Sequence, residues 1–468
     1  MAKEKGQILE EIRPLLGSEN RFALEKILDE QRSSDIAEIV ELLDNDQRRF
    51  VFDVLEKNVS AEVLEKVDEA TRSELFELFG EKELTELISE LDPDDAADVL
   101  SELGQEESED VLDHMPEEDA DQIKDLMAYS EDSAGGIMDP VLVSVKENAT
   151  ITEAIREIQS AEIDEDFFSV FVVSDNGKFV GDIRIRDLLT RKETTSIKDL
   201  TDTDTIYVHV DTDQEHVRNI FSKNDLIVMP VLDAKNRLVG RITADRVIEV
   251  AEEEAAEDMY VMAGTGAAEL EKISAVHAAK VRMTWLLPCL AGTAVTAVVL
   301  LTFKNIFAAG SYPYIYTTIV AFAPMIAAIS GNAGLQTSAI VVSGLATGDL
   351  AAISLRQVFA REVRVALFVA ISCGIVGGIL CGLLPNVMNG GNTNEITPAL
   401  AEHLKIVAAF STAMFSAIMV STTLGLFLPF LFKRIGIDPA ISSGPLITTA
   451  NDSISVTIYM TLTLALIH

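Results

Sequence analysis

Five long apolar runs follow Arg282 and limit the fold more than any other feature of this sequence. They cover residues 283–303, 313–346, 365–384, 406–432 and 439–467. About 20 consecutive apolar residues suffice to cross a bilayer as a helix. The runs therefore predict a five-helix transmembrane domain over residues 282–468. The second run is too long for one straight span, so we expect it to tilt, protrude or break.

The negative charge of the chain lies almost entirely before these runs. The sequence holds 37 Lys and Arg against 76 Asp and Glu, but only eight of these bases and six of these acids follow residue 281. A region as acidic as residues 1–281 repels nucleic acid and anionic lipid. No nucleic-acid partner is expected, and the partner that the charge favours is a cation.

Residues 1–135 show a repeated pattern of short amphipathic segments. Segments that pair two or three apolar residues with acids begin at a constant spacing, at Glu86, Asp98, Asp110 and Gln122. Helices this short bury their apolar faces only when they stack. We therefore predict an N-terminal α-helical superhelix. Asp92-Pro93-Asp94-Asp95 is typical of a helix start, with acids at the positive end of the dipole.

Residues 136–250 alternate between predicted strands and helices and contain one duplication. A strand, a turn and a second strand occur at Val170–Asp175 and Phe179–Ile183, and the same pattern recurs at Val228–Asp233 and Leu238–Ile242. A short helix follows each pair. The arrangement resembles a tandem pair of CBS domains, an α+β regulatory module that often holds adenine nucleotides.

A long acidic linking helix is predicted next, over residues 251–281, continuing a helical stretch from residue 244 with a break near Gly264-Thr-Gly266. Between Arg246 and Lys272 there are eight acids and no base. Glu249, Glu253 and Glu257 follow one another at successive helical turns, and like charges so spaced cost roughly 0.2–0.5 kcal/mol per pair. A helix built this way is destabilised by its own charges until something neutralises them.

Loop charges indicate the orientation of the spans. Arg356, Arg361 and Arg364 lie between the second and third runs, whereas residues 385–400 contain no Lys or Arg. Basic loops stay on the cytoplasmic side. We therefore expect a multi-pass protein of the cell inner membrane, with its N-terminal half in the cytoplasm and its C-terminus outside.

Asp452 is the sharpest candidate for contact with an ion. It lies near the centre of the fifth run and is the only acid deep in any run. A carboxylate at that depth costs about 2.5–3.5 kcal/mol on insertion scales, so it usually faces water or a partner. The bases Lys405 and Lys433 lie at the ends of runs. A protonated Asp452 bonded to nearby Ser and Thr is the alternative, and an aqueous, cation-attracting pore accounts better for the residue.

Amide side chains complete the candidate pore. Asn332 and Gln336 stand one helical turn apart in the second run, where Pro324 and two glycines favour a locally loosened backbone, and Asn451 precedes Asp452. Small residues also serve close helix packing. One acid with amides and hydroxyls suits hydrated Mg²⁺, which gives up water reluctantly. The pattern disfavours zinc or copper and leaves Co²⁺ and Ni²⁺ open as hydrated mimics.

Several motifs resemble those of the MgtE family. Arg282-xx-Trp285-Leu-Leu resembles the start of the first span, and Gly331-Asn-Ala-Gly-Leu-Gln-Thr-Ser338 resembles the second. Asp438-Pro-Ala and Ser443-Gly-Pro-Leu-Ile-Thr-Thr-Ala-Asn-Asp452 resemble the last span. The order of helical domain, CBS pair, acidic helix and five spans covers essentially the whole chain.

The resemblance implies a homodimeric Mg²⁺ channel in membrane lipid, with Asp452 of both subunits at the ion. It also implies that Mg²⁺ binds between the cytoplasmic domains and the linking ("plug") helix, which holds the pore shut when internal Mg²⁺ is high. The positions that match the family's sensor acids are Asp95, Glu215, Asp225, Asp245, Glu249, Glu254, Glu257 and Asp258. Any one of these acids alone is more simply a solvated surface charge.

Two departures from the family pattern bear on the sensor. The family tends to have two adjacent acids at the end of the second CBS module, whereas Asp245 is followed by Arg246, which could replace one bridging cation with a salt bridge. CBS nucleotide sites often end in Thr/Ser-x-x-Asp, and Thr243-Ala-Asp-Arg246 breaks that spacing. The family resemblance therefore allows ATP as a ligand, but this spacing argues against it.

The predicted switch is electrostatic: facing acids repel at low internal Mg²⁺, and bridging ions favour the closed state at high Mg²⁺. Moving such an equilibrium from 1:99 to 99:1 takes about 5.5 kcal/mol of differential binding. An ion-coupled secondary transporter or exchanger that uses Asp452 as a proton or Na⁺ site is the main alternative. The pore carboxylate argues against a CBS-regulated anion channel. An enzyme is not expected, because no nucleophile–base pair or phosphate loop is evident.

Overall fold

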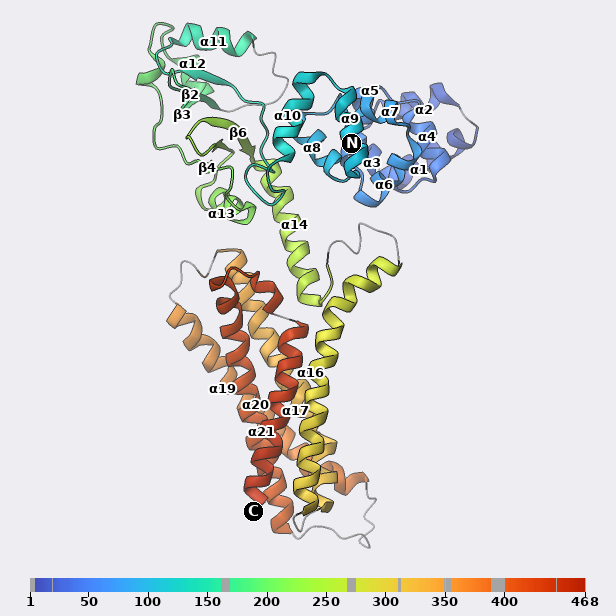
Figure 1. Ribbon diagram of the computed structural model, residues 1–468, viewed down its shortest axis with the longest axis vertical. Coiled ribbons are helices and arrows are strands. Elements are labelled where there is room, and N and C mark those ends of the chain that lie inside the picture. The colour runs from blue at the N-terminus through green and yellow to red at the C-terminus, as the bar shows by residue number, and fades with distance from the viewer. Residues whose placement is uncertain are drawn as a thin grey trace. The chain divides into compact units, whose positions relative to one another are not determined.

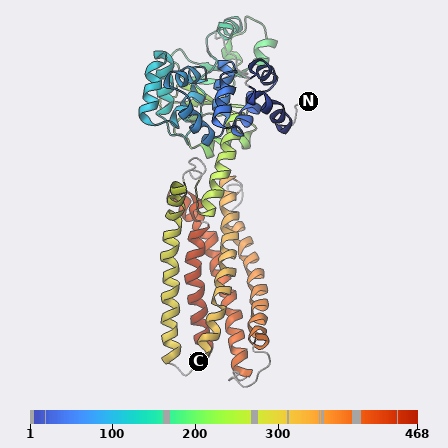
Figure 2. The same cartoon turned by 90° about the vertical axis from the view of Figure 1, so that its right-hand side faces the viewer.

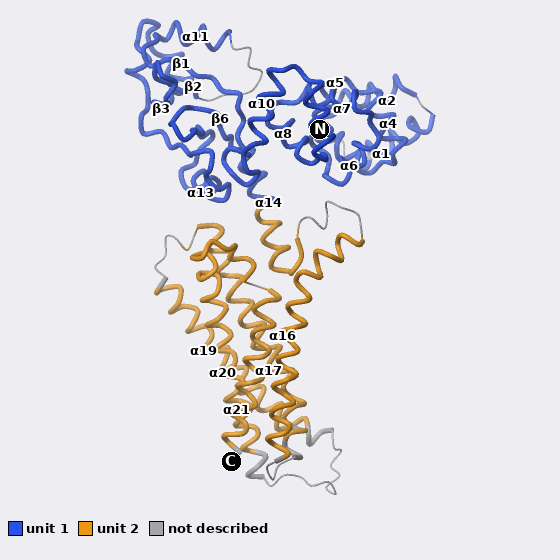
Figure 3. The backbone as a smooth tube through the Cα atoms, viewed as in Figure 1, with its two compact units in different colours: residues 1–253 blue, residues 254–468 orange. Residues whose placement is uncertain are grey.

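The computed structural model describes residues 5–18, 20–160, 169–266, 275–309, 313–348, 350, 355–388, 400–442 and 444–467. The chain forms two compact units, Met1–Glu253 and Glu254–His468 (Figure 3). Each unit has its own buried hydrophobic cores.

Ten short helices form the first part of unit 1 (Figure 1). They are α1 (Lys5–Gly17), α2 (Arg21–Leu28), α3 (Ser33–Glu41), α4 (Asn45–Phe52), α5 (Lys57–Lys66), α6 (Glu69–Leu78), α7 (Glu81–Ile88), α8 (Pro93–Ser101), α9 (Gln105–His114) and α10 (Glu117–Met127). The repeated sequence segments fall on α7 to α10, so the predicted N-terminal helical domain is confirmed. Pro93 occupies the first turn of α8, where its missing N–H costs nothing.

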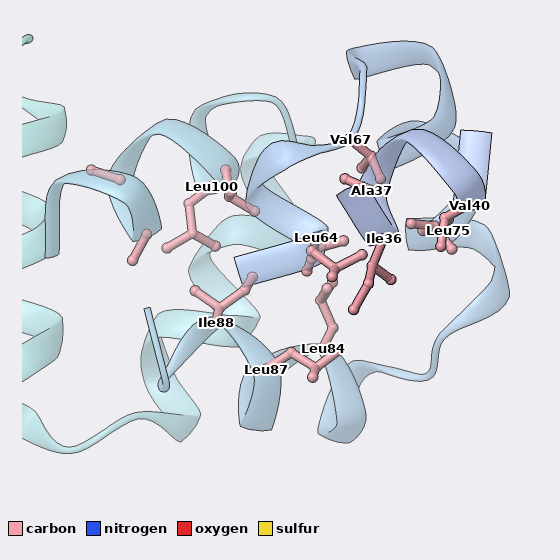
Figure 4. Close-up of a cluster of buried hydrophobic side chains, with 14 of the residues drawn as sticks. Ile36, Ala37, Val40, Leu64, Val67, Leu75, Leu84, Leu87, Ile88 and Leu100 are labelled. Carbon is pink, nitrogen blue, oxygen red and sulfur yellow. The ribbon is translucent and has the colours of Figure 1, made fainter. Parts of the chain in front are cut away.

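The core of this helical domain is shared among successive helices. Leu64, Leu75, Ile88 and Leu100 come from α5, α6, α7 and α8 in turn, and all four are fully buried in one cluster (Figure 4). Helices of 8 to 13 residues are marginal in water on their own. Their stability therefore comes from this stacking, as the sequence pattern predicts.

Two three-stranded sheets follow, each with a parallel and an antiparallel pair. The first contains β1 (Ser144–Lys146), β2 (Ser169–Val173) and β3 (Phe179–Arg184), with helices α11 (Ile151–Ser160) and α12 (Ile185–Thr190) and the short 3-10 helix η1 (Ile197–Asp199). The second contains β4 (Val208–His209), β5 (Val228–Leu232) and β6 (Leu238–Thr243), with helix α13 (Gln214–Asn224). Both sheets have the strand order first, second, third.

The two sheets repeat each other in register as well as in order. Val172 pairs with Gly181 in the first sheet, and Val231 pairs with Gly240 in the second, so the offset along the chain is the same on both strands. The register shifts directly after Val172 and directly after Val231. This agreement confirms the duplication and the predicted tandem CBS fold.

Helix α14 (Ala244–Ala263) continues directly from β6. It ends at Ala263, and the next residue, Gly264, has a φ of 79°, which lies in the left-handed region that glycine tolerates best. The predicted break in the linking helix is therefore found at its predicted position. Residues 267–274 of that predicted helix lie outside the described residues.

Long helices make up the described part of unit 2 (Figures 1 and 2). They are α16 (Ala275–Ala309), α17 (Pro313–Ala346), α19 (Leu355–Met388), α20 (Leu400–Arg434) and α21 (Pro445–Ile467), with the short 3-10 helix η2 (Pro439–Ser442) before α21. Helix α20 packs against α19, α17 and α21, while α21 also packs against α17 and α16.

Four described helices are long and apolar enough to cross a membrane: α16, α17, α19 and α20. The fifth predicted run also forms a helix, α21, but α21 is not among the described helices found long and apolar enough to cross a membrane. The loosened backbone expected near Pro324 is not found, since α17 is one continuous helix of 34 residues. At about 51 Å it exceeds the bilayer core of about 30 Å, so it must tilt or protrude.

Candidate functional site

Unit 1 contains a cavity of about 610 Å³ with a strongly acidic wall. The start of α8, the β-strands of the CBS pair and the first turns of α14 all contribute side chains to it. Three bases lie among more than twice as many acids. The acids are Glu65, Asp92, Asp94, Asp95, Asp139, Asp245 and Glu249, and the bases are Lys66, Arg241 and Arg246.

Two helix starts place three of these seven carboxylates. Asp94 and Asp95 occupy the first turn of α8, and Asp245 occupies the first turn of α14. Acids are favoured there because the backbone N–H groups carry partial positive charge. The preference for acids in the first turn of a helix therefore explains why these carboxylates line the same cavity.

Burial raises the pKa of Asp92, Asp94, Asp95 and Asp139, and the shift is large for two of them. It raises the pKa of Asp94 to about 8, with further repulsion from Asp95 and Asp139. Burial raises the pKa of Asp95 to about 7, with repulsion from Glu65 and Asp92. A carboxylate held among like charges gains most from a cation that enters beside it.

Two arginines already neutralise part of the wall. Arg241 pairs with Asp139 at 2.7 Å between Nε and Oδ2, and the guanidinium is almost fully buried. Arg246 pairs with Asp98 of α8 and, at 3.2 Å, with Glu249 of its own helix. Arg246 thus forms a salt bridge to the helical domain, and its replacement of a bridging cation stays a prediction.

The structure brings together three of the eight predicted sensor acids, namely Asp95, Asp245 and Glu249. Glu215 lies on α13 beside Arg218 at 3.6 Å, and Asp225 is exposed at the left-handed end of that helix. The remaining three, Glu254, Glu257 and Asp258, lie on the part of α14 that belongs to unit 2.

Sequence reasoning missed Glu65, Asp92, Asp94 and Asp139 as members of the cavity. The run Asp92-Pro93-Asp94-Asp95 carried a signal for two of them, since every acid of a helix start lies within one turn. Asp139 and Glu65 had no comparable local signal. Among the described residues, no three His, Cys, Asp or Glu side chains converge closely enough to enclose a metal ion.

In unit 2, Asp452 lies on α21 and is half-buried. Among the described residues no Lys or Arg forms an ion pair with it. Asn332 and Gln336 are exposed and lie one turn apart on the same face of α17. Their position leaves three polar side chains accessible on helices that are otherwise strongly apolar.

Asn451, the fourth predicted pore residue, has different surroundings. Its side chain is 1% exposed, and its Nδ2 donates to Ser330 Oγ of α17 at 2.9 Å. Its Oδ1 has no hydrogen-bond partner among the described residues. Within one chain, the Asn451 amide therefore contacts a neighbouring helix rather than an open surface.

Three family models match this chain. The MgtE intracellular N domain matches residues 31–132, the CBS domain matches residues 134–193 and 197–253, and the MgtE divalent cation transporter matches residues 323–462. Together they span both units and follow the order of the helical domain, the CBS pair and the long helices.

Individual relatives give the same result. The magnesium transporter MgtE of Thermus thermophilus is 31% identical over 338 residues, which cover 72% of this chain and 70% of that protein. The magnesium transporter MgtE of Enterococcus faecalis is 31% identical over 336 residues, which cover 72% and 69%. A crystal structure of the cytosolic domain of the Mg²⁺ channel MgtE in complex with ATP superposes with a TM-score of 0.50 and 30% identity, covering 52% of this chain and 99% of that one. The chain therefore belongs to the MgtE family of magnesium transporters.

Proposed function

We propose that this protein is a channel that imports hydrated Mg²⁺ and is closed by Mg²⁺ bound to its acidic cytosolic part. The observation that carries the proposal is Asp452, a half-buried carboxylate of α21 with no basic partner among the described residues. Asn332 and Gln336 are exposed on α17, which packs directly against α21. Carboxylate and amide oxygens are suitable acceptors for the water shell of Mg²⁺.

The exposed polar groups support a path formed by two copies of the chain. Polar and ionisable side chains at membrane depth normally face a protein interior or a water-filled cavity. Asn332 and Gln336 would face lipid in a lone chain, whereas a second copy facing α17 and α21 would enclose them. We therefore propose a homodimer in which both copies of Asp452 and of these amides line one aqueous path.

The acidic cavity of unit 1 supports the regulatory half of the proposal. Asp94 and Asp95 are costly to ionise in the absence of a cation, because they are buried among other carboxylates. Mg²⁺ near Asp95, Asp245 and Glu249 would remove that cost and favour the compact arrangement of α8 and α14. Glu215, Asp225, Glu254, Glu257 and Asp258 remain further candidate ligands.

We propose a multi-pass location in the inner membrane. Four helices of spanning length support it, and α21 would add a fifth span. The basic loops favour a cytoplasmic N-terminal half and a C-terminus outside. Co²⁺ and Ni²⁺ would pass as hydrated mimics of Mg²⁺.

ATP is a second candidate ligand of the CBS pair, supported by the solved MgtE cytosolic domain that holds it. Thr243 and Ala244 line the acidic cavity, but Arg246 stands where CBS nucleotide sites often have Asp. A nucleotide titration of the purified chain followed by its unfolding temperature tests this ligand: binding raises the temperature, and no change removes ATP from the proposal.

Purified protein in planar bilayers tests the channel against a coupled carrier, the alternative that Asp452 also supports as a proton or Na⁺ site. We expect unitary Mg²⁺ currents whose reversal potential follows the Mg²⁺ gradient alone. A reversal potential that shifts with the proton or Na⁺ gradient would establish a carrier instead. Limited proteolysis of the same protein across a Mg²⁺ titration tests the sensor, with protection at high Mg²⁺ expected.

A further inference from the structure

The two residues that flank Asp452 each form a hydrogen bond to a different neighbouring helix. Asn451 Nδ2 donates to Ser330 Oγ of α17 at 2.9 Å. On the other side, Ser453 Oγ lies 2.8 Å from Thr296 Oγ1 of α16 and donates to the Gly292 carbonyl of α16 at 3.2 Å. Asp452 is thus bracketed by two side-chain contacts between helices.

Most other hydroxyls of α21 bond within their own helix. Thr448, Thr449, Thr457 and Thr463 each donate to the backbone carbonyl one turn earlier. Such bonds do not hold α21 against its neighbours, because no second helix takes part. Tyr459, two turns further along α21, does reach another helix, since its hydroxyl donates to the Ile319 carbonyl of α17 at 3.0 Å. The contacts of Asn451 and Ser453 also join helices, and they lie directly beside the ion-binding candidate.

The contacts of Asn451 and Ser453 fix the direction in which the Asp452 carboxylate points, because the three residues are consecutive on one helix. Consecutive residues on a helix point about 100° apart. Asn451 faces α17 and Ser453 faces α16. The Asp452 side chain lies between these two and therefore points in a direction between those of its neighbours. Rotation of α21 would break the buried Asn451–Ser330 hydrogen bond, in which Ser330 is fully buried and already donates to the Ile326 carbonyl at 2.7 Å.

We infer that Ser330–Asn451 and Thr296–Ser453 form a positioning clamp that holds the Asp452 carboxylate toward the ion path. The inference rests on the proposed role of Asp452 and assigns Asn451 to positioning rather than to ion contact. It predicts that residues of α16 and α17 with no contact to the ion govern its passage.

Matched substitutions separate this clamp from ordinary packing. Ser330→Ala removes the clamp hydroxyl on α17, while Ser338→Ala removes an equally buried hydroxyl of the same helix that has no partner among the described residues. Thr296→Val removes the clamp hydroxyl on α16, while Thr302→Val removes one that bonds within α16. Displacing a binding group by about 1 Å can lower a rate by up to about 100-fold. We expect Mg²⁺ flux into liposomes to fall at least about tenfold in the clamp variants and less than twofold in the controls.

A second measurement reports position without depending on flux. In a chain whose Cys289, Cys373 and Cys381 are replaced by alanine, Asp452→Cys is labelled with a small cationic thiol reagent. The labelling rate of the Asp452→Cys chain alone is the reference. Adding Ser330→Ala should change this rate about tenfold. Adding Ser330→Thr, which keeps a hydroxyl, should give the reference rate again, and so should adding Ser338→Ala. Equal labelling rates in all three would overturn the clamp. Wild-type flux in Asp452→Asn would instead refute the proposed role of Asp452 itself.

Discussion

The two units place carboxylates in opposite circumstances. Unit 1 gathers seven acids around one cavity with only three bases, so their mutual repulsion is the dominant feature. Unit 2 presents one half-buried acid on α21, among helices whose polar side chains mostly bond to their own backbone. Under the proposed function, the crowded acids respond to the amount of a cation, whereas the lone acid in an apolar surround attracts a cation to one place. On this proposal, the number and spacing of carboxylates distinguish sensing from passage.

The largest effect expected from this comparison is at the lone acid. Asp452→Asn removes the charge with little change in shape, and no acid of the described residues lies beside Asp452 to replace it. A hydrogen bond to a charged group contributes about 1.5–3 kcal/mol, so Mg²⁺ flux should fall by about 10- to 100-fold or more. Flux into liposomes loaded with a Mg²⁺-sensitive dye measures this. Thr463→Val, a buried site on the same helix, should keep flux near wild type.

A smaller effect is expected at the crowded acids. Asp95→Asn together with Asp245→Asn removes two of the seven cavity carboxylates and leaves flux at low Mg²⁺ intact. The Mg²⁺ concentration for half-maximal protection from proteolysis should rise about tenfold, the equivalent of about 1.4 kcal/mol of binding. Asp46→Asn, an exposed acid in the first turn of α4, is the control and should leave that concentration unchanged.

The raised pKa values of Asp94 and Asp95 predict a pH dependence of stability. Because the folded chain holds these protons more tightly than the unfolded chain, the stabilisation is present below about pH 4 and is lost as pH rises toward 8. Mg²⁺ should therefore raise the unfolding temperature of unit 1 more at pH 8 than at pH 6. Calorimetry of the full chain measures both transitions, and a Mg²⁺ effect independent of pH in this range would contradict the assignment.

The smallest effect is expected at Arg246, which already supplies a positive charge to the crowded side. In the absence of Mg²⁺, Arg246→Gln should lower the free energy of unfolding by about 1 kcal/mol, because Asp98 and Glu249 lose their ion-pair partner. It should also enlarge the stabilisation by Mg²⁺. Arg237→Gln, which breaks an exposed pair with Asp233, serves as the control and should change stability by only a few tenths of a kcal/mol.

Patterns that repeat along the chain were the most predictable part of the fold. The regular spacing of the short amphipathic segments located α7 to α10, and the duplicated strand pattern located the antiparallel strand pairs of both sheets. The long apolar runs located the five long helices α16, α17, α19, α20 and α21 of the described part of unit 2. The prediction from Pro324 was wrong, because the backbone is not loosened there and α17 is a continuous helix through this residue.

The sites were less predictable because they depend on contacts between distant segments. Asp95, Asp245 and Glu249 meet in one cavity, but Asp139 and Glu65 join it through tertiary packing that no local pattern reveals. Asn451 was predicted to be a pore residue because it precedes Asp452 in the sequence. Its burial against Ser330 depends on how α17 and α21 pack, which a single run of residues does not encode.

One measurement tests the division between the two regions most directly. Mg²⁺ flux is recorded in liposomes as the Mg²⁺ concentration on the cytosolic face is raised, for wild type, Asp452→Asn and the pair Asp95→Asn with Asp245→Asn. The account predicts that the first substitution lowers the flux at every concentration and that the pair keeps the maximal flux but shifts its inhibition to higher Mg²⁺. Full flux in Asp452→Asn, or loss of maximal flux without a shifted inhibition in the pair, would contradict it.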